Sequence, residues 1–239
     1  MTSNSRRSFL SRLGVAASAA GATFAVGAPA AKAQTPADGR WQPVRHPQDD
    51  WLDQLPGKHR LFFDTTTQAA LADAIQFAGN FYSANKTGYG LENADLAVVV
   101  CMRHNSAPFA FNDAMWAKYG VTLAARAEFT DPKTKEAPKV NFHTPVAPTA
   151  PGTPAAPGAP AAPARARGLA NLMSLGVQFA ICDLSTHGIA GLIARASGGT
   201  AEAVYKELTA NLIDKARLVP AGIVAVNRAQ EHGYSITGS

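Results

Sequence analysis

The segment Gly176-Val-Gln-Phe-Ala-Ile-Cys-Asp-Leu-Ser-Thr-His-Gly188 decides the fold that we expect for this chain. Its apolar run, residues 177–181, is rich in strand formers and then turns polar, as a buried parallel strand does where it leaves a sheet. We expect a small polar turn after this strand and a helix from about residue 189. Cys182 would then lie at the carboxyl end of a strand and before a helix start. Open α/β sheets bind ligands at such ends, and a helix N-terminus favours a thiolate there.

Position alone leaves the role of Cys182 open. Free cysteine is among the most buried residue types and often acts as a small apolar filler. Asp183 follows it directly, and a nearby carboxylate disfavours the thiolate. Cys182 is therefore either a reactive thiol or a packed core residue.

Four further segments have strand character, and helical patterns alternate with them. The clearest strand, residues 95–102, is apolar on both faces and is expected at the centre of the sheet. The others are expected at residues 58–64, 217–220 and 234–236. Helices are expected after a capping-box spacing at Thr65 and Gln68, and from Pro108. This alternation predicts an α/β fold with five short, mostly parallel strands.

The first 33 residues resemble an export signal. Ser5-Arg6-Arg7-Ser8-Phe9-Leu10 matches the twin-arginine motif, and a weakly apolar stretch follows at residues 13–30. Ala31-Lys32-Ala33 provides a small-x-small cleavage site. Because polar residues interrupt the apolar stretch, we expect a removable signal peptide at residues 1–33 and no membrane span after its removal. The predicted location is the periplasm.

The positive charge of the chain lies mostly in that signal. Four of the 22 basic residues and none of the 17 acidic residues belong to residues 1–33, so the remainder is nearly neutral. The charge therefore gives no reason to expect a nucleic-acid partner. Residues 34–56 are rich in Pro, Asp and Trp and lack periodicity. We expect an extended N-terminal arm that packs Trp41 and Trp51 on the body or on a neighbour.

A Pro- and Ala-rich stretch interrupts the strand–helix alternation. Residues 145–163 alternate Pro, Ala, Gly and Thr and carry no charge. Such a composition buries too little apolar surface to offset chain entropy, so we expect a flexible insertion at residues 131–167. The alternation resumes afterwards, and either half alone would be small for a separate core. Residues 57–239 are therefore expected to form one α/β domain.

A polar cluster follows the strand at residues 95–102 and begins with Arg103 and His104. If this strand and the Cys182 strand are neighbours, both carboxyl ends line one crevice. A nearby cation stabilises a thiolate, so Arg103 and His104 are candidate electrostatic supports for Cys182. Weaker candidates for binding a substrate in the same crevice are Asn105, Asp183 and His187.

Structural alternatives exist for each of these groups. Arg103 has three carboxylates with which it could form an ion pair: Asp95, Asp113 and Asp183. His104 would then only cap a loop. Cys101 and Cys182, the two cysteines of the chain, could form a disulfide, which requires Cα atoms within about 7 Å. A bridge would remove the free nucleophile.

Motifs for metals and cofactors are missing from the sequence. It contains no Cys-x-x-Cys and no Cys/His zinc spacing. Gly198-Gly199 ends an expected helix instead of following a strand, so a phosphate loop is not indicated. No Gly-x-Ser-x-Gly elbow is present. We therefore predict no cofactor and no metal.

Several motifs together resemble the DsrE/DsrF-like family over residues 58–236, apart from the insertion. The matching segments are Gly176-Val177, Phe179-Ala180, Cys182, Val219-Pro220-Ala221-Gly222-Ile223 and Glu231-His232-Gly233-Tyr234. Arg103-His104, Pro108 and residues 112–116 resemble exported members. The resemblance implies a three-layer α/β sandwich over a roughly five-stranded sheet, commonly in homo-oligomers. It also implies a persulfide carrier, and Cys182 is the position that matches the family's cysteine.

The sequence thus leads to two functional hypotheses. The first is an exported sulfur-handling or thiol-redox accessory protein that carries sulfur on Cys182 and acts with a sulfur-donor or redox protein. The second is a non-catalytic periplasmic module that binds a small ligand or a partner segment in the same crevice. Whether the chain is an enzyme is left open.

Overall fold

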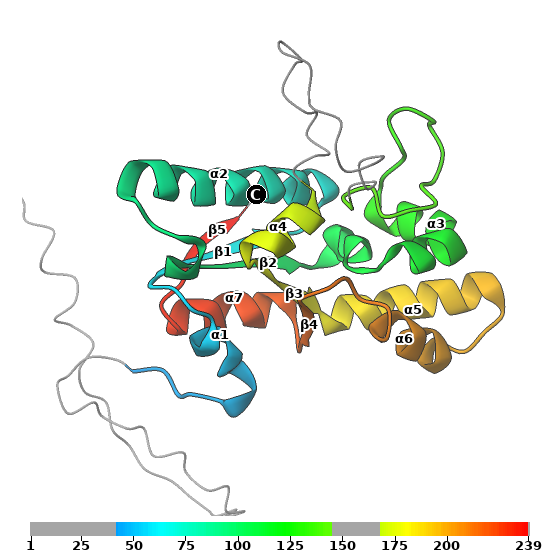
Figure 1. Ribbon diagram of the computed structural model, residues 1–239. Helices are drawn as coiled ribbons and strands as arrows, with labels where there is room; N and C mark the ends of the chain where they lie inside the picture. Colours follow the sequence, from blue (N-terminus) through cyan, green and yellow to red (C-terminus); the bar gives the residue numbers. More distant parts are fainter. Residues whose placement is uncertain (1–41, 145–167, 239) are drawn as a thin grey trace, which may run out of the picture. The chain divides into compact units, whose positions relative to one another are not determined.

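The computed structural model describes residues 42–144 and 168–238, and its parallel strands form one sheet in the order β4-β3-β2-β1-β5 (Figure 1). The strands are β1 (His59–Thr65), β2 (Leu96–Met102), β3 (Gln178–Cys182), β4 (Ala216–Val219) and β5 (Ser235–Gly238). Each lies within two residues of its expected position. The prediction of an α/β fold with a five-stranded sheet is confirmed, and the sheet is parallel throughout.

Helices connect these strands and cover both faces of the sheet. The described α-helices are α1 (Trp51–Gln54), α2 (Gln68–Tyr89), α3 (Asp113–Ala127), α4 (Leu169–Leu175), α5 (Asp183–Ser197), α6 (Ala201–Thr209) and α7 (Gly222–Glu231). The described 3₁₀ helices are η1 (Pro47–Asp49), η2 (Asn93–Asp95) and η3 (His104–Ala110). Thr67, not Thr65, caps α2, because Thr65 still belongs to β1 and the Thr67 hydroxyl accepts the N–H of Ala70.

The sheet lies between two layers of helices, as a three-layer sandwich requires. All seven residues of β2 are buried, and their side chains alternate between two apolar clusters. Helices α2 to α6 contribute to the larger cluster, whereas α1 and α7 contribute to the smaller one. Figure 1 shows α2 above the sheet and α7 with α1 below it. The face of the sheet that α7 and α1 cover is therefore protected by fewer helices than the opposite face.

Two helix starts differ from expectation. After β2 the chain forms η3, which contains Pro108, and α3 begins only at Asp113 because the Asn112 side chain accepts the N–H of Met115. No polar turn follows β3, and α5 begins at Asp183, directly after the strand. The reason is that Cys182 itself occupies the N-cap position, a role in which sulfur is rare.

The N-terminal arm is only partly extended. Residues 43–56 contain η1 and α1, and Trp51 is buried against the body as predicted. The helix α1 forms because this segment has apolar side chains to bury, Trp51 and Leu52. Trp41 and the expected signal peptide, residues 1–33, lie outside the described residues, so the export signal stays a prediction.

Part of the expected flexible insertion is packed. Residues 145–167 lie outside the described range, but Asn141 and His143 are buried. The Asn141 amide donates hydrogen bonds to the carbonyls of Phe109 and Phe111, at 2.7 and 2.9 Å. These bonds satisfy backbone groups in the η3–α3 connection, so Asn141 and His143, inside the range of the expected insertion, are packed into the domain, whereas residues 132–136 are exposed.

Just before β1, the backbone at Gly57 approaches the start of β2 so closely that a side chain would not fit. Its φ is +104°, and a Cβ there would lie 2.6 Å from backbone atoms of Leu96. We expect Gly57→Ala to lower the free energy of unfolding by about 2–3 kcal/mol, from backbone strain and overpacking. The matched control is Gly90→Ala, where φ is +66° but no atom lies within 4 Å, and about 1 kcal/mol is expected. Equal losses in urea titrations would contradict the steric argument.

Candidate functional site

Cys182 ends β3 and caps α5 at the carboxyl edge of the sheet. Its Sγ accepts the backbone N–H of Ser185 at 3.4 Å. Unpaired N–H groups at a helix N-terminus stabilise negative charge, so this position suits a thiolate. The residue is only 6% exposed, however. Reaction at this sulfur therefore needs a small local opening or a slender reagent.

The two cysteines are both free thiols. Cys101 pairs in register with Ala180, and Cys182 lies two residues further along β3. Strand spacing and rise then separate the two cysteine Cα atoms by about 8 Å, beyond the reach of a disulfide. The disulfide that the sequence left open does not form in this fold.

Cys101 is an unsuitable nucleophile. It is wholly buried, and its Sγ lies 3.9 Å from the carbonyl oxygen of Gly222. Burial raises the pKa of the Cys101 thiol far above its ordinary value, and the neighbouring Asp64 carboxylate raises it further. Cys182 is thus the better candidate of the two thiols.

Arg103 does lie at the same edge, but its partner is Asp64. The guanidinium donates two parallel hydrogen bonds to the Asp64 carboxylate, from Nε at 2.7 Å and from Nη2 at 2.8 Å. These bonds raise the pKa of Arg103 against the opposing effect of burial, and the charges of Asp64, Cys101 and Cys182 add to the rise. Arg103 is therefore close enough to interact with a negative charge on Cys182, although Asp64 already offsets most of the positive charge of Arg103.

Asp64 is the site residue that sequence reasoning missed. None of the three carboxylates considered for Arg103 is its partner. Asp64 lies opposite Cys101 in the register of β1 and β2, and both strands end at the same edge. The signal was present in the sequence, because Asp64 and Arg103 each close an expected strand. It needed the additional knowledge that the two strands are neighbours.

His104 and Asn105 have mainly structural contacts. The backbone N–H of His104 donates to the Ser185 hydroxyl at 3.0 Å, which ties η3 to the first turn of α5, and the His104 side chain is exposed. Asn105 is 5% exposed, and its side-chain oxygen accepts a hydrogen bond from Arg126. His104 is therefore beside the Cys182 helix start, whereas the amide of Asn105 is occupied.

Asp183 and His187 form a group with Tyr205 of α6. The Tyr205 hydroxyl donates to Asp183 at 2.7 Å, and His187 Nε2 lies 3.6 Å from the same carboxylate. The His187 and Tyr205 rings stack with centroids 3.9 Å apart. The Tyr205 hydrogen bond partly shields the Asp183 charge beside Cys182. Sequence reasoning did not include Tyr205.

An exposed apolar rim flanks this edge of the sheet. Leu184 in the first turn of α5 is 67% exposed, and Ile223 in the first turn of α7 is 61% exposed. A hollow of about 410 Å³ lies elsewhere on the surface, between α3, residues 137–139 and the end of α5. Its lining includes neither Cys182 nor Arg103. The candidate site is thus a shallow edge rather than a deep pocket.

Two kinds of feature are absent from residues 42–144 and 168–238. No group of three or more His, Cys, Asp or Glu side chains within this range is arranged to hold a metal ion. No helix in the same range has the length and apolar character that a membrane crossing needs.

Comparisons with known proteins leave the family unassigned. No family model matches the sequence, and no curated protein matches it. Among solved structures, the chain is similar to a protein of unknown function, MTH1491, from Methanobacterium thermoautotrophicum, with 12% identity and a TM-score of 0.35. The match covers 76% of this chain and 100% of that one. So distant a likeness carries no argument, and the class of the protein, a parallel three-layer α/β sandwich, rests on its own sheet.

The Asp64–Arg103 pair is expected to matter for stability. Its side chains are 15% and 26% exposed. Asp64→Asn leaves the guanidinium without its anion, and we expect a loss of about 2 kcal/mol, less than for a fully buried pair because solvent screens it. Lys86→Gln breaks the exposed Lys86–Glu92 pair and should cost under about 1 kcal/mol. Equal effects of the two variants in urea titrations would show that this half-buried pair contributes no more than a surface one.

Proposed function

We propose that this chain is an exported sulfur-handling or thiol-redox accessory protein of the DsrE/DsrF-like type, and that Cys182 carries the sulfur. The observation that supports this best is a free thiol at the N-cap of α5, at the carboxyl end of the interior strand β3. The family and the export signal come from the sequence alone. The proposed partner is a protein or small molecule that carries a persulfide.

The proposed step is a transfer of sulfane sulfur without net oxidation. The Cys182 thiolate attacks the outer sulfur of a donor persulfide. The donor's S–S bond breaks, a new S–S bond forms on Cys182, and the donor leaves as a thiolate that takes up a proton. Backbone N–H groups at the start of α5 stabilise negative charge on the attacking sulfur before transfer and on the persulfide afterwards.

Two neighbouring features are consistent with this role. Arg103 lies close enough for the charge of Cys182 to act on it, although Asp64 holds the guanidinium. The exposed Leu184 and Ile223 provide an apolar rim on which a donor's segment can rest. A partner that carries its sulfur on a flexible segment fits the limited exposure of Cys182.

Incubation with a low-molecular-weight persulfide, followed by alkylation and intact-mass measurement, tests the proposal. We expect one added sulfur atom per chain, mapped by peptide analysis to Cys182 and removed by dithiothreitol. A thiol that is alkylated normally but never gains sulfur would contradict the proposal. The untreated protein, carried through the same alkylation, is the control.

A second candidate is a non-catalytic binding module. The low exposure of Cys182 and the engagement of Arg103 by Asp64 favour it, because both reduce reactivity at the edge. In that case the native protein would resist alkylation until it is denatured. The same experiment therefore separates the two functions.

A further inference from the structure

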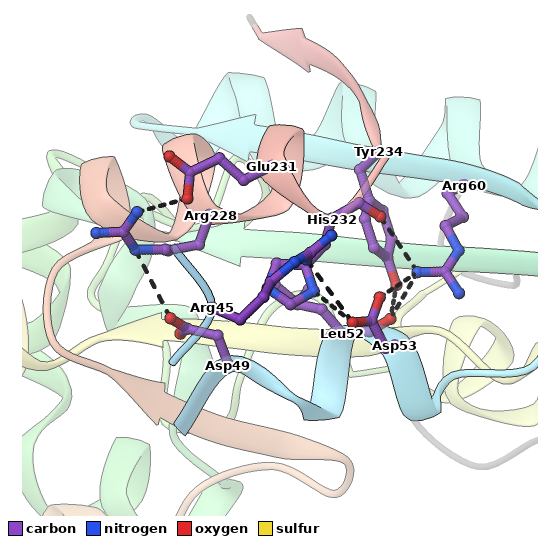
Figure 2. Close-up of polar contacts among 9 residues, drawn as sticks. All are labelled: Arg45, Asp49, Leu52, Asp53, Arg60, Arg228, Glu231, His232 and Tyr234. Atoms are coloured by element: carbon purple, nitrogen blue, oxygen red, sulfur yellow. Dashed lines mark hydrogen bonds and ion pairs between the residues drawn. The ribbon is translucent and has the colours of Figure 1, made fainter. Parts of the chain in front are cut away.

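Residues 45–55 lie across the α7 face of the sheet and are attached to it chiefly by side-chain contacts (Figure 2). We call this segment the strap. It contains η1 and α1, and α1 has only four residues. So short a helix has no stability of its own, because nucleation costs more than a single turn returns. The strap therefore keeps its place through what holds it to the body.

The first attachment is centred on Asp53. Its Oδ2 lies 2.9 Å from Nδ1 of the buried His232, and its Oδ1 accepts a hydrogen bond from Arg60 Nη1 at 3.1 Å. Arg60 also donates to the carbonyl of Leu52, and so does the Tyr234 hydroxyl, at 2.8 Å. Figure 2 shows these groups converging on the end of α1 from β1 and from the end of α7.

The second attachment is looser. Arg228 of α7 is hydrogen-bonded to Glu231, and its Nε lies 3.6 Å from Oδ2 of Asp49. That distance is too long for a hydrogen bond, and Asp49 Oδ2 is buried without one. A buried carboxylate oxygen with no donor weakens the hold of the strap at this end. Asp53 is therefore the stronger of the two anchors.

The strap also covers part of the sheet with two apolar side chains. Trp51 and Leu52 belong to one buried cluster with Ala180 and Val219. Ala180 precedes Cys182 by two residues, and Val219 is paired with Cys182 in register. Apart from the strap, α7 is the one described helix that packs on this cluster. If the strap detached, the apolar side chains of this cluster would become exposed to solvent. Those of Ala180 and Val219 lie next to Cys182, the candidate thiol.

We propose that the strap opens as a unit while the sheet stays folded, and that Asp53 is an acid-released latch that holds it shut. The proposal is independent of the sulfur chemistry. It assigns a conformational role to a polar network that the candidate site does not use. Opening would give a partner access to the α7 side of the Cys182 strand.

The charges around the latch determine the direction of the pH effect. Burial raises the pKa of Asp53, but the charge of His232 and the hydrogen bonds from His232 and Arg60 outweigh it, with help from Arg45, so the pKa lies below its usual 3.8. A carboxyl whose pKa is lowered in the closed state holds that state above its ordinary pKa and releases it as pH falls through the lowered value. Protonated Asp53 would also leave Arg45, on the strap, facing Arg60 and His232.

The neighbouring attachment involves other residues than the latch. Asp49 and Glu231 both face Arg228, but Glu231 belongs to α7, so Asp49 alone joins the strap to Arg228 at this end. The Tyr234 bond to Leu52 remains at low pH, because both of its groups are uncharged there.

Hydrogen exchange of the full chain, followed by mass spectrometry, tests the proposal. At pH 7 we expect Asp53→Asn to speed exchange of amides in the strap by about tenfold, with amides of β2 unchanged. Asp50→Asn is the matched control, because Asp50 is exposed and makes no side-chain cap bond. In the unaltered protein, strap exchange corrected for intrinsic rates should rise relative to β2 between pH 6 and pH 3. That rise should be absent in Asp53→Asn and retained in Tyr234→Phe.

Two results would overturn the proposal. If strap and β2 amides of the unaltered protein exchange with equal protection, the strap opens only when the whole domain unfolds. If Asp53→Asn behaves as Asp50→Asn does, the Asp53 contacts do not hold the strap. A rise at low pH that persists in Asp53→Asn would show that another group releases the strap, which contradicts the role given to Asp53.

Discussion

Cys182→Ser is expected to abolish sulfur uptake from a persulfide donor. The hydroxyl of serine cannot form the S–S bond on which the proposed transfer depends. It can still accept the N–H of Ser185, and serine is a favoured N-cap residue, so α5 should keep its start. The fold is therefore expected to survive while the activity falls to background. The measurement is intact mass after incubation with the donor, supported by a circular dichroism spectrum.

Cys101→Ala is the matched control for that variant. Cys101 is wholly buried, and burial raises the pKa of its thiol far above the ordinary value. We expect this variant to lose about 1 kcal/mol of stability and to take up sulfur nearly as well as the unaltered protein. Sulfur uptake that depends on Cys101 instead of Cys182 would contradict the proposal that Cys182 carries the sulfur. Uptake by neither cysteine would leave the binding module as the better function.

Arg103 distinguishes an electrostatic role at the thiol from a purely structural one. Arg103→Lys keeps a charge but loses the planar fork that matches the Asp64 carboxylate. If the guanidinium serves only to hold β1 to β2, stability falls and the rate of Cys182 alkylation at fixed pH is unaffected. Because Asp64 already balances the charge, the structure favours this outcome.

The fold could be predicted because its signals are local. The apolar runs of β2 and β3 are visible without any knowledge of their neighbours, and both were placed within a residue. The start of α5 was missed because a cysteine took a place that Ser, Thr, Asp or Asn usually fills. The packing of Asn141 was missed because the composition around it resembles a loop. Asn141 is buried because its amide donates hydrogen bonds to two backbone carbonyls about 30 residues earlier in the chain.

The polar contacts of the site could not be predicted, because they join residues far apart in the chain. Asp64 and Arg103 are 39 residues apart, and in the strap network outside the site Asp53 and His232 are 179 apart. Charge pairing of this kind depends on strand order and on which helix covers which face. Composition and periodicity determine neither. The sequence therefore indicated where a site should lie, at the carboxyl ends of β2 and β3. It did not indicate which carboxylate would form the ion pair with Arg103 there.

His143 gives the chain a built-in sensitivity to acid. Its ring lies edge-on to Phe109, with centroids 4.8 Å apart, and to Phe142 at 5.5 Å. Its Nε2 lies 3.4 Å from the amide nitrogen of Gln68. Burial lowers the pKa of His143 from 6.5 to about 4. The folded protein thus excludes a proton that the unfolded chain accepts.

The sign and size of the effect follow from that difference. A histidine whose folded pKa is lowered contributes stability that is fully present above pH 6.5 and is lost as pH falls toward 4. We expect a loss of about 3 kcal/mol between pH 7 and pH 4 from this residue. His143→Phe, which keeps an apolar ring and removes the titrating group, should lose correspondingly less over the same range. The exposed His59, replaced by Phe, is the control for introducing a phenylalanine ring. Urea titrations at pH 7, 5 and 4 measure all three proteins, and identical slopes for the unaltered protein and His143→Phe would show that the ring is not held neutral by burial.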